Sequence, residues 1–291
     1  MSTSAPEVSL IVCTRNRAPA LGRCLDAIAR ADHQSVEAEL IVVDNGSTDG
    51  TAGLIEGFAE TTPLSVRLVL QPRIGLSNAR NSGLEAAKGR LVAFTDDDCY
   101  VAEDYFSELA DSYRTGAFDY SGGRVFMYDP SAAWCAGTEQ TAFELIPPHS
   151  FIAAGRVQGA NIMMRRAVYE RVGPFDPALG AGTRFRCEDV DYIARAADAG
   201  FTGAHLPNVV VLHDHGRKPG AEMRGLNQAN DFARGAYYGK RFALGDRRAA
   251  YYWVRQLFAC PQPPACILRR IRRFPREVRG AFAYLRQLSV K

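Results

Sequence analysis

The chain has 291 residues, of which 47% are hydrophobic and 23% are charged, and this suits one large α/β domain or two smaller ones. Such a composition excludes an intrinsically disordered chain, a collagen and a coiled coil. The formal net charge is only +3, so charge alone favours neither a membrane nor nucleic acid as a partner, and we expect no nucleic acid to bind.

Short apolar strands alternate with helices over the first hundred residues. Strands are expected at 8–13, 40–43, 66–70 and 91–95, and a helix follows each of the first three. Because these strands are apolar on both faces, they indicate a parallel sheet that is covered by helices on both sides. Polar loops follow three of the strands, at 14–17, 44–49 and 96–98. Ligands of open α/β sheets bind at the carboxyl edge, so we expect these loops to form one site.

An acidic triplet, Asp96 to Asp98, directly follows the fourth predicted strand. Asp96 and Asp98 are two residues apart, so they point to the same side if the strand geometry continues. Two neighbouring carboxylates repel each other unless a cation lies between them, and hard oxygen ligands suit Mg²⁺ or Mn²⁺. The alternative is an acidic loop that caps the next helix, near Glu103. The position directly after a buried strand favours metal binding.

Beyond residue 115 the alternation of strands and helices becomes less regular. We expect an irregular excursion at 128–158, a strand at 160–164, a helix at 188–199, a strand at 209–212 and helices from about 221 onward. His213 and His215 follow the last of these strands. Imidazole is a good Mn²⁺ ligand, so one of them can complete a metal site, although a lone histidine is more often packed or at the surface. We expect His213 to be the ligand, with His215 as the alternative.

Two acidic residues, Glu188 and Asp189, begin the predicted helix at 188–199. Acidic side chains in a first turn interact favourably with the helix dipole, and this alone accounts for their presence. Asp189, however, lies one turn before Ile193, which belongs to the apolar face of the helix. We therefore expect the Asp189 carboxylate to point into the protein, where it can act as a general base.

Several other polar residues can contact a nucleotide. Asp44 ends the second strand and can accept a hydrogen bond from a base, although a simple loop aspartate is the alternative. Thr14, Asn16 and Arg80 can contact phosphate or base, but Arg80 by itself is most simply a solvated helix arginine. The sequence has no Walker motif, no GxGxxG after a strand, no GxSxG and no HExxH. These absences disfavour P-loop NTPases, Rossmann dehydrogenases, serine hydrolases and zincins.

Taken in order, these motifs resemble those of family 2 glycosyltransferases, inverting enzymes of the GT-A fold that use nucleotide-diphospho-sugars. The resemblance covers about residues 6–215. The matching segments are 8–17, 41–49, 75–83, 94–98, 159–166, 172–176 and 187–189. It implies an α/β fold with a Rossmann-like, mostly parallel sheet flanked by helices. We expect a catalytic domain at 1–220, with a nucleotide-binding half at about 6–100 and an acceptor-side half at about 115–220, and a helical basic extension at 221–291.

The resemblance also implies a role for individual residues. Asp98 is the expected direct ligand of Mn²⁺ or Mg²⁺, with Asp96 and His213 beside it. The residues expected to bind the nucleotide are Thr14, Asn16, Asp44, Asn45, Arg80, Asp96 and Asp97. Asp189 is the expected general base, with Glu188 as the other member of the acidic pair. Gly159 and Asn161 are expected near the donor or acceptor sugar.

The implied activity is transfer of a sugar from a nucleotide-diphospho-sugar, with UDP as the expected nucleotide, to a hydroxyl of a glycan or lipid-linked acceptor. Cell-surface glycan or polysaccharide biosynthesis is the expected setting. The Gln-x-x-Arg-Trp signature of processive synthases is missing, which favours transfer of a single sugar. One alternative is a sugar-1-phosphate nucleotidylyltransferase, although the loop after the first strand is not glycine-rich. The other is a non-catalytic sugar-nucleotide or glycan-binding module, which Asp98 and Asp189 disfavour.

The C-terminal segment carries a strong positive charge. Residues 234–291 contain fourteen basic and two acidic residues, a net charge of +12, whereas residues 1–233 carry 21 basic and 30 acidic residues, a net charge of −9. Within 265–291, arginines alternate with apolar residues at helical spacing, and Pro275 must kink or interrupt the helix. This segment either lies on an anionic membrane surface or packs on the catalytic domain as an amphipathic helix.

The expected location is cytoplasmic, with peripheral attachment to the cytoplasmic face of a membrane as a further possibility. The first residues do not combine a charged and an apolar region as a secretory signal does, and no apolar run approaches the ~20 residues of a membrane span. The seven cysteines are scattered and form no CxxC, which fits a reduced protein.

Overall fold

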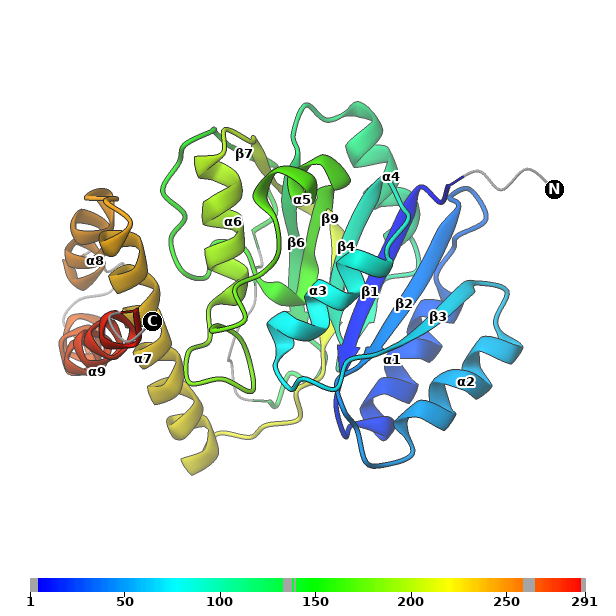
Figure 1. Ribbon diagram of the computed structural model, residues 1–291, viewed down its shortest axis with the longest axis horizontal. Helices are drawn as coiled ribbons and strands as arrows, with labels where there is room; N and C mark the ends of the chain where they lie inside the picture. Colours follow the sequence, from blue (N-terminus) through cyan, green and yellow to red (C-terminus); the bar gives the residue numbers. More distant parts are fainter. Residues whose placement is uncertain (1–4, 133–137, 139, 259–264, 289–291) are drawn as a thin grey trace.

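The computed structural model describes residues 5–132, 138, 140–258 and 265–288 (Figure 1). The strands are β1 (Val8–Thr14), β2 (Ala38–Asp44), β3 (Ser65–Leu70), β4 (Leu91–Asp96), β5 (Cys99–Val101), β6 (Tyr120–Met127), β7 (Glu144–Ile146), β8 (Ile162–Arg165) and β9 (Gly203–His213). The helices are α1 (Ala18–Arg30), α2 (Thr51–Thr61), α3 (Leu76–Ala86), α4 (Tyr105–Thr115), α5 (Arg166–Val172), α6 (Glu188–Asp198), α7 (Ala221–Ala243), α8 (Arg248–Phe258) and α9 (Ala265–Leu288), with a 3₁₀ turn at Gly159–Asn161. The expected α/β sheet flanked by helices, with a helical C-terminal region, is confirmed (Figure 1).

One sheet runs through the molecule in the order β3-β2-β1-β4-β8-β6-β9-β5, with β7 paired to β9. Its first four strands are parallel, and their register aligns the ends of the strands. Thr14 lies opposite Asp44, and Cys13 lies opposite Asp96. The polar loops that follow β1, β2 and β4 therefore meet at one edge of the sheet, as the sequence predicts.

The other half of the sheet is mixed. β8 is antiparallel to both β4 and β6, and β5 is antiparallel to β9, which places Cys99 opposite His213. The strand expected at 160–164 begins only at Ile162, because a 3₁₀ turn precedes it. β7 lies within the expected irregular excursion at 128–158, of which residues 133–137 and 139 are outside the described part.

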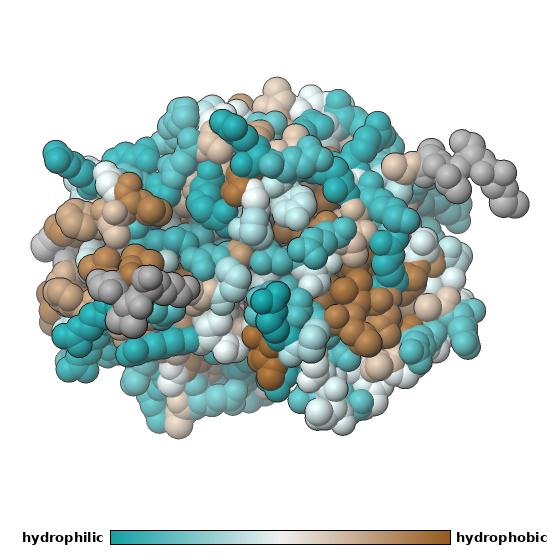
Figure 2. Space-filling view, in the orientation of Figure 1, coloured by the Kyte–Doolittle hydropathy of each residue, from teal (hydrophilic) through white to brown (hydrophobic). Residues whose placement is uncertain are grey.

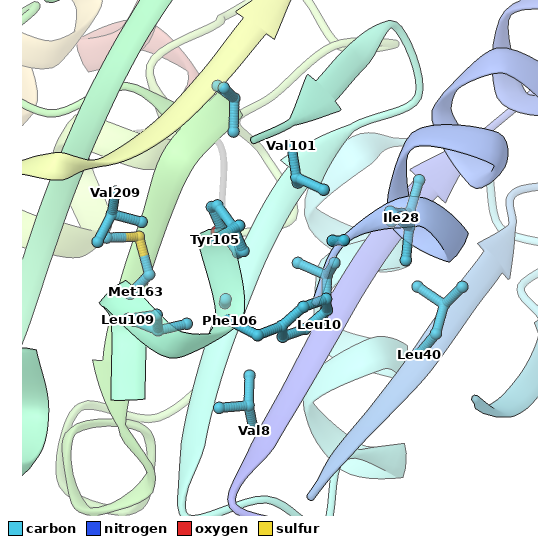
Figure 3. Close-up of a cluster of buried hydrophobic side chains, with 14 of the residues drawn as sticks. Val8, Leu10, Ile28, Leu40, Val101, Tyr105, Phe106, Leu109, Met163 and Val209 are labelled. Carbon is cyan, nitrogen blue, oxygen red and sulfur yellow. The ribbon is translucent and has the colours of Figure 1, made fainter. Parts of the chain in front are cut away.

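Alternate residues of the central strands face two hydrophobic cores, one on each side of the sheet. Leu10 of β1 packs with side chains of α1 and α4, including Ile28 and Phe106 (Figure 3). Its neighbour Ile11 belongs to the opposite core, which α3, α5 and α6 cover. Both faces of the sheet are thus covered, which explains why most residues of its central strands are apolar. The exposed parallel-strand ends are left to form the site.

The three C-terminal helices lie together at the end of the molecule opposite β3 (Figure 1). Tyr237 and Tyr238 of α7 are buried in the core that also contains α6. α9 packs closely on α7, because Gly235 of α7 and Gly280 of α9 bring the two backbones together. Pro275 lies inside α9. Among the described helices, none combines the length and the apolar character that a membrane crossing needs.

Gly235→Ala is expected to destabilise the protein, because an added Cβ would overlap the backbone carbonyl of Glu277 and push α9 away from α7. Such overpacking typically costs about 1–3 kcal/mol. Gly225→Ala is the matched control on the same helix, since a Cβ there meets no atom within 4 Å. It should stabilise the helix by up to about 1 kcal/mol. Thermal unfolding of the two variants measures the difference, and equal melting temperatures would contradict the close packing of α7 and α9.

Candidate active site

Two adjoining cavities open at the carboxyl ends of the parallel strands. The first has a volume of about 430 Å³ and is lined by the loops after β1, β2 and β4. The second has a volume of about 500 Å³ and lies between α3, the start of α6 and α7. Asp96 and His213 line both cavities. The two spaces therefore form one bipartite cleft, with two polar side chains among the residues at its junction.

The acidic triplet begins at this junction with Asp96, and its third member, Asp98, contacts two basic side chains. Asp98 accepts a hydrogen bond of 2.7 Å from Arg17 Nη2, and its other oxygen lies 3.3 Å from His213 Nε2. Burial raises the pKa of Asp98, but the hydrogen bond from His213 and the charges of His213 and Arg17 outweigh it and lower the pKa to about 2. Asp98 is therefore an anion at neutral pH, the form that binds a cation.

A group of possible metal ligands surrounds Asp98. Ligand atoms of Asp96, Asp98, Cys99 and His213 lie within 4.8 Å of one another. Burial raises the pKa of the Cys99 thiol well above its ordinary value, so this residue stays protonated and belongs to the hydrophobic core. His213 Nδ1 is buried without a hydrogen-bond partner in the described part of the chain. Two carboxylates and an imidazole remain, and this donor set fits Mn²⁺ or Mg²⁺.

His213, and not His215, belongs to this donor group within the residues that the structure describes. The pairing of β5 with β9 brings His213 beside the triplet, since β5 begins directly after Asp98. His215 accepts a hydrogen bond of 3.0 Å from the backbone N–H of Arg217 at its Nδ1, and its ring meets that of His213 edge-on. The expectation that names His213 as the ligand therefore has the better geometric support.

The end of β1 and the loop after it contact Asp97, the second aspartate of the triplet, through a hydrogen bond and an ion pair. Thr14 Oγ1 donates a hydrogen bond of 2.7 Å to Asp97, and Arg17 Nη1 lies 2.9 Å from the other oxygen of Asp97. Burial raises the pKa of Asp97 to about 6 although Arg17 and Thr14 oppose this change. Arg17 thus binds Asp97 and Asp98 together. The sequence interpretation includes its loop in the site but does not single out Arg17.

The loop after β2 forms the rim of the first cavity. Asp44 accepts a hydrogen bond of 2.8 Å from the backbone N–H of Ser47, and Asn16 accepts one of 2.7 Å from the N–H of Thr48. Asn45 donates to the carbonyl of Arg73 at 2.8 Å and so connects β2 to the segment before α3. Of the residues predicted in the loops after β1 and β2, Thr14 and Asn45 line the cavity itself. Asp44 and Asn16 shape the loops beside it.

Arg80 connects the acidic triplet to the acidic pair at the start of α6. Its side chain is only 3% exposed, so the interpretation of Arg80 as a solvated surface residue is wrong. Nη1 donates a hydrogen bond of 2.8 Å to Glu188, and Nη2 lies 3.7 Å from Asp96. Burial raises the pKa of Glu188 to about 7, with Asp189 adding to the increase and Arg80 opposing it. The small residues on the inner face of α3 let this arginine lie against the sheet.

Asp189 faces the second cavity, as we expect from its position before Ile193. It accepts a hydrogen bond of 2.9 Å from the N–H of Gly159 and one of 2.8 Å from the N–H of Val190. Gly159 also accepts a bond from Arg80 Nη2, and a Cβ at Gly159 would lie 2.5 Å from that nitrogen. The absence of a side chain at Gly159 therefore allows Arg80 and Asp189 to lie on either side of one backbone segment.

Asn161 occupies a different place from the other predicted site residues. Its side chain is fully buried and donates to the carbonyls of Arg124 and Val209, both at 3.0 Å, while its oxygen accepts from Tyr105. It lines neither cavity among the described residues. The geometry shows Asn161 as a bridge that holds β6, β9 and α4 together behind the site.

Two arginines of the second cavity are not singled out by the sequence. Arg186 lies just before the acidic pair, and Arg234 comes from α7. The sequence separates 221–291 from the catalytic part and therefore gives no signal that α7 would line the cleft. Only the packing of α7 against the core makes Arg234 part of this cavity.

Comparison with known proteins gives a consistent result. The family model described as "Glycosyl transferase family 2" matches residues 9–173. The glycosyltransferase AglE of Haloferax volcanii is 28% identical over 213 residues, which are 73% of this chain and 68% of AglE. The succinoglycan biosynthesis protein ExoM of Rhizobium meliloti is 28% identical over 215 residues, which are 72% of this chain and 68% of ExoM.

The fold is also similar to that of a solved structure. The mannosyltransferase PcManGT of Pyrobaculum calidifontis, in complex with GDP-Man and Mn²⁺, superimposes with a TM-score of 0.61. The alignment covers 99% of this chain and 87% of that chain, with 22% sequence identity. At this identity the similarity concerns the fold, and it extends over the C-terminal helices as well as the sheet.

Proposed function

Because the chain belongs to glycosyl transferase family 2, and is therefore a glycosyltransferase, we propose that it transfers one sugar from a nucleotide-diphospho-sugar to an acceptor hydroxyl with inversion. The observation that carries this proposal is the bipartite cleft, with the metal-ligand group at its junction and Asp189 in the second cavity. Family membership favours transfer over the two alternatives, a nucleotidylyltransferase and a non-catalytic binding module. The name of ExoM supports a setting in cell-surface glycan or polysaccharide biosynthesis.

The first cavity would hold the nucleotide. Its loops present Thr14, Asn45 and Asp97, and Asp44 lies beside them. Asp96, Asp98 and His213 would hold Mn²⁺ or Mg²⁺, and a bound divalent cation neutralises charge on the diphosphate leaving group. The complex of PcManGT with GDP-Man and Mn²⁺ supports this assignment. Arg80 lies beside Asp96 and keeps the Glu188 carboxylate in place next to the junction.

The second cavity would hold the acceptor. Asp189 removes the proton of the acceptor hydroxyl, and that oxygen attacks the anomeric carbon from the face opposite the diphosphate. The bond from this carbon to the diphosphate oxygen breaks at the same time, and the nucleoside diphosphate leaves. Two backbone N–H groups donate hydrogen bonds to Asp189 and fix its orientation. Backbone amides keep their protons, so the carboxylate can still accept the proton of the acceptor hydroxyl. General base catalysis of this type contributes about 10²–10⁴-fold to the rate. Inversion follows from this direct displacement, in which no covalent intermediate with the protein forms.

A thermal-shift experiment with nucleotides tests the proposed function. UDP is expected to raise the melting temperature in the presence of Mn²⁺, and GDP and dTDP are the comparisons. A ligand at 100 times its Kd stabilises the protein by about 2.7 kcal/mol. For a chain of this size that corresponds to an increase of roughly 5 °C. EDTA should abolish the shift. If no nucleotide diphosphate or nucleotide sugar raises the melting temperature with either metal, the proposed function is wrong.

We also propose that the C-terminal helices contact an anionic membrane surface at the cytoplasmic face, which suits a lipid-linked acceptor. One side of α9 packs on α7 through residues such as Gly280 and Tyr284. The opposite side is exposed over five turns and combines apolar and basic residues. Its members are Leu268, Ile271, Arg272, Pro275, Arg279, Phe282 and Arg286. The two interpretations of the tail are therefore compatible, since α9 packs on the protein and still presents a second face.

The charge of this face identifies its proposed partner. The only acidic residue of 248–288 is Glu277, and its side chain is buried. Tyr251 of α8 and Phe282 of α9 are exposed, as are several arginines of the same helices. Figure 2 shows hydrophobic and hydrophilic surface together at the end of the molecule where Figure 1 places these helices. Apolar residues combined with unopposed positive charge are typical of a helix that lies on an anionic lipid surface.

Sedimentation with vesicles tests this membrane contact. The double variant Ile271→Ser, Phe282→Ser is expected to bind vesicles of phosphatidylglycerol at least about tenfold more weakly than the wild type, because two large exposed side chains no longer enter the lipid. Leu70→Ser is the matched control, since Leu70 is 68% exposed on β3 at the opposite end. Binding to pure phosphatidylcholine should be weaker throughout. Equal sedimentation of the double variant and the wild type would contradict the proposal.

A further inference from the structure

The second cavity has several basic residues in its wall. Arg186 and Arg234 line it, together with the buried pair of Arg80 and Glu188. Asp189 lies in the same cavity, so a group bound at this wall would be close to the hydroxyl that Asp189 deprotonates. The chemistry of this wall therefore bears on which acceptor the enzyme takes.

Arg234 is held firmly by the C-terminal helices. Its Nη1 donates to Asp231 at 3.1 Å and to Glu277 at 3.0 Å. Glu277 is 1% exposed, and its second oxygen accepts a bond of 2.6 Å from the indole N–H of Trp253. Side chains of α7, α8 and α9 thus fix the guanidinium. Because both carboxylates bind Nη1, the other nitrogens of Arg234 remain as donors toward a ligand.

This network contains more positive than negative charge. Asp231 also pairs with Arg276 at 2.8 Å, and Glu277 also pairs with Arg273 at 3.1 Å. Three arginines therefore share two carboxylates, which leaves a net charge of +1. The pKa of Arg273 is lowered by burial and by the positive charge of Arg234, which reflects the same excess. Arg234 is the member of the network that lines the cavity.

Arg186 adds a second positive charge at the rim. Its side chain is exposed and has no hydrogen bond or ion pair within the described residues. Cys187, which follows it, has a left-handed backbone with φ of 94°, a conformation that costs a non-glycine residue of order 1 kcal/mol or more. This turn separates Arg186 from the start of α6 and leaves it on the cavity wall. The described part of the chain supplies no partner for it.

We propose that the second cavity binds an anionic group of the acceptor, a phosphate or a carboxylate, between Arg186 and Arg234 and beside Asp189. Guanidinium groups bind both anions through paired N–H donors, which makes two arginines a selective recognition element. The inference rests on the proposed function, because it names the class of acceptor for that site. A lipid-linked sugar phosphate and an acidic sugar of a growing glycan share this chemistry.

Calorimetric titration of the enzyme tests the proposal. The protein is first saturated with Mn²⁺ and with UDP, or with GDP or dTDP if one of these binds instead. The probes are octyl glucosyl phosphate and octyl glucuronide, each compared with neutral octyl glucoside. The wild type is expected to bind the anionic probes at least about tenfold more tightly, as charge-assisted hydrogen bonds imply. Arg186→Gln should remove this preference. Arg184→Gln is the matched control, because Arg184 lies two residues away and stacks on Phe185 and Phe232 outside the cavity.

The outcomes separate this inference from the proposed function. Preference for the phosphate probe points to a lipid-linked phosphate, and preference for the glucuronide points to an acidic sugar; both support an anionic acceptor. Equal binding of all probes, or a preference that survives in Arg186→Gln, overturns it. A preference for UDP-glucuronic acid over UDP-glucose that Arg186→Gln removes would also overturn it, by assigning the anion to the donor. Failure of any nucleotide to bind with Mn²⁺ contradicts only the proposed function.

Discussion

Asp189→Asn is expected to lower the rate of sugar transfer by about 10²–10⁴-fold while the enzyme still binds its donor. The amide has nearly the size of the carboxylate, and its oxygen can still accept one of the two backbone hydrogen bonds, from Gly159 or Val190. What it lacks is the ability to take the proton of the acceptor hydroxyl. The loss should therefore fall on kcat, and the affinity for the nucleotide should change little.

Steady-state kinetics with calorimetric titration of the nucleotide distinguish these two effects. Asp191→Asn is the matched control on the same helix, because Asp191 is buried in ion pairs with Arg195 and Lys240 and lines neither described cavity. That variant should lose stability and keep most of its turnover. If Asp189→Asn retained the turnover of the wild type, Asp189 would not be the base, and Glu188, whose pKa burial raises to about 7, would be the next residue to test.

The parallel half of the fold can be predicted from the sequence because its strands are continuous apolar runs. Strands β1, β2 and β4 are buried on both faces, and this constraint is visible in most residues of each run; Ser9 and Glu39 are buried polar exceptions that bond to each other. Strand β6 is missed because Gly122 and Gly123 interrupt its pattern. Gly123 lies against the side chain of Asn161, where a Cβ would not fit. The packing therefore requires a glycine, and this glycine weakens the strand pattern in the sequence.

The site is predictable as a set of motifs but not as a set of contacts. The register of the parallel strands brings Thr14, Asp44 and Asp96 together, and this follows from their position at strand ends. The approach of His213 to Asp98 depends on the antiparallel pairing of β5 with β9. β5 has only three residues, too few to give a periodic signal. Long-range pairings of this kind leave no mark in the local sequence.

The burial of Arg80 also cannot be predicted from the local sequence, because it depends on an ion pair with a distant residue. A helix arginine is expected in water unless a partner compensates the loss of hydration, and its partner Glu188 is 108 residues away in the sequence. The small residues Ala79 and Gly83 on α3 can be recognised in the sequence, and they permit close packing on β1 and β2. The pairing of Arg80 with Glu188 cannot be recognised there, because it forms only when the chain folds. Arg234 is a stronger example, because an entire helix must dock before it reaches the cleft.

Asp98→Asn is expected to abolish the dependence of nucleotide binding on Mn²⁺ and to weaken UDP binding by at least about tenfold, which corresponds to about 1.4 kcal/mol. The substitution keeps the shape of the side chain and removes the charge that pairs with Arg17 and would hold the cation. Asp98 is the residue of the triplet whose pKa is lowered, whereas burial raises the pKa values of Asp96 and Asp97. Its charge is therefore the one most available for a metal at neutral pH.

Asp97→Asn provides the comparison that makes this result specific to the metal. Asp97 is the adjacent residue, is equally buried and also pairs with Arg17, but its hydrogen bond from Thr14 turns it toward the loop after β1, and it is absent from the ligand group of the described residues. That variant should weaken UDP binding with and without Mn²⁺ by a similar factor. Titration of each variant with UDP, once with Mn²⁺ and once with EDTA, measures how far its affinity for UDP depends on the metal. If Asp98→Asn kept the response to Mn²⁺ and Asp97→Asn lost it, the cation would bind on the nucleotide side of the triplet, and His213 would have no part in holding it.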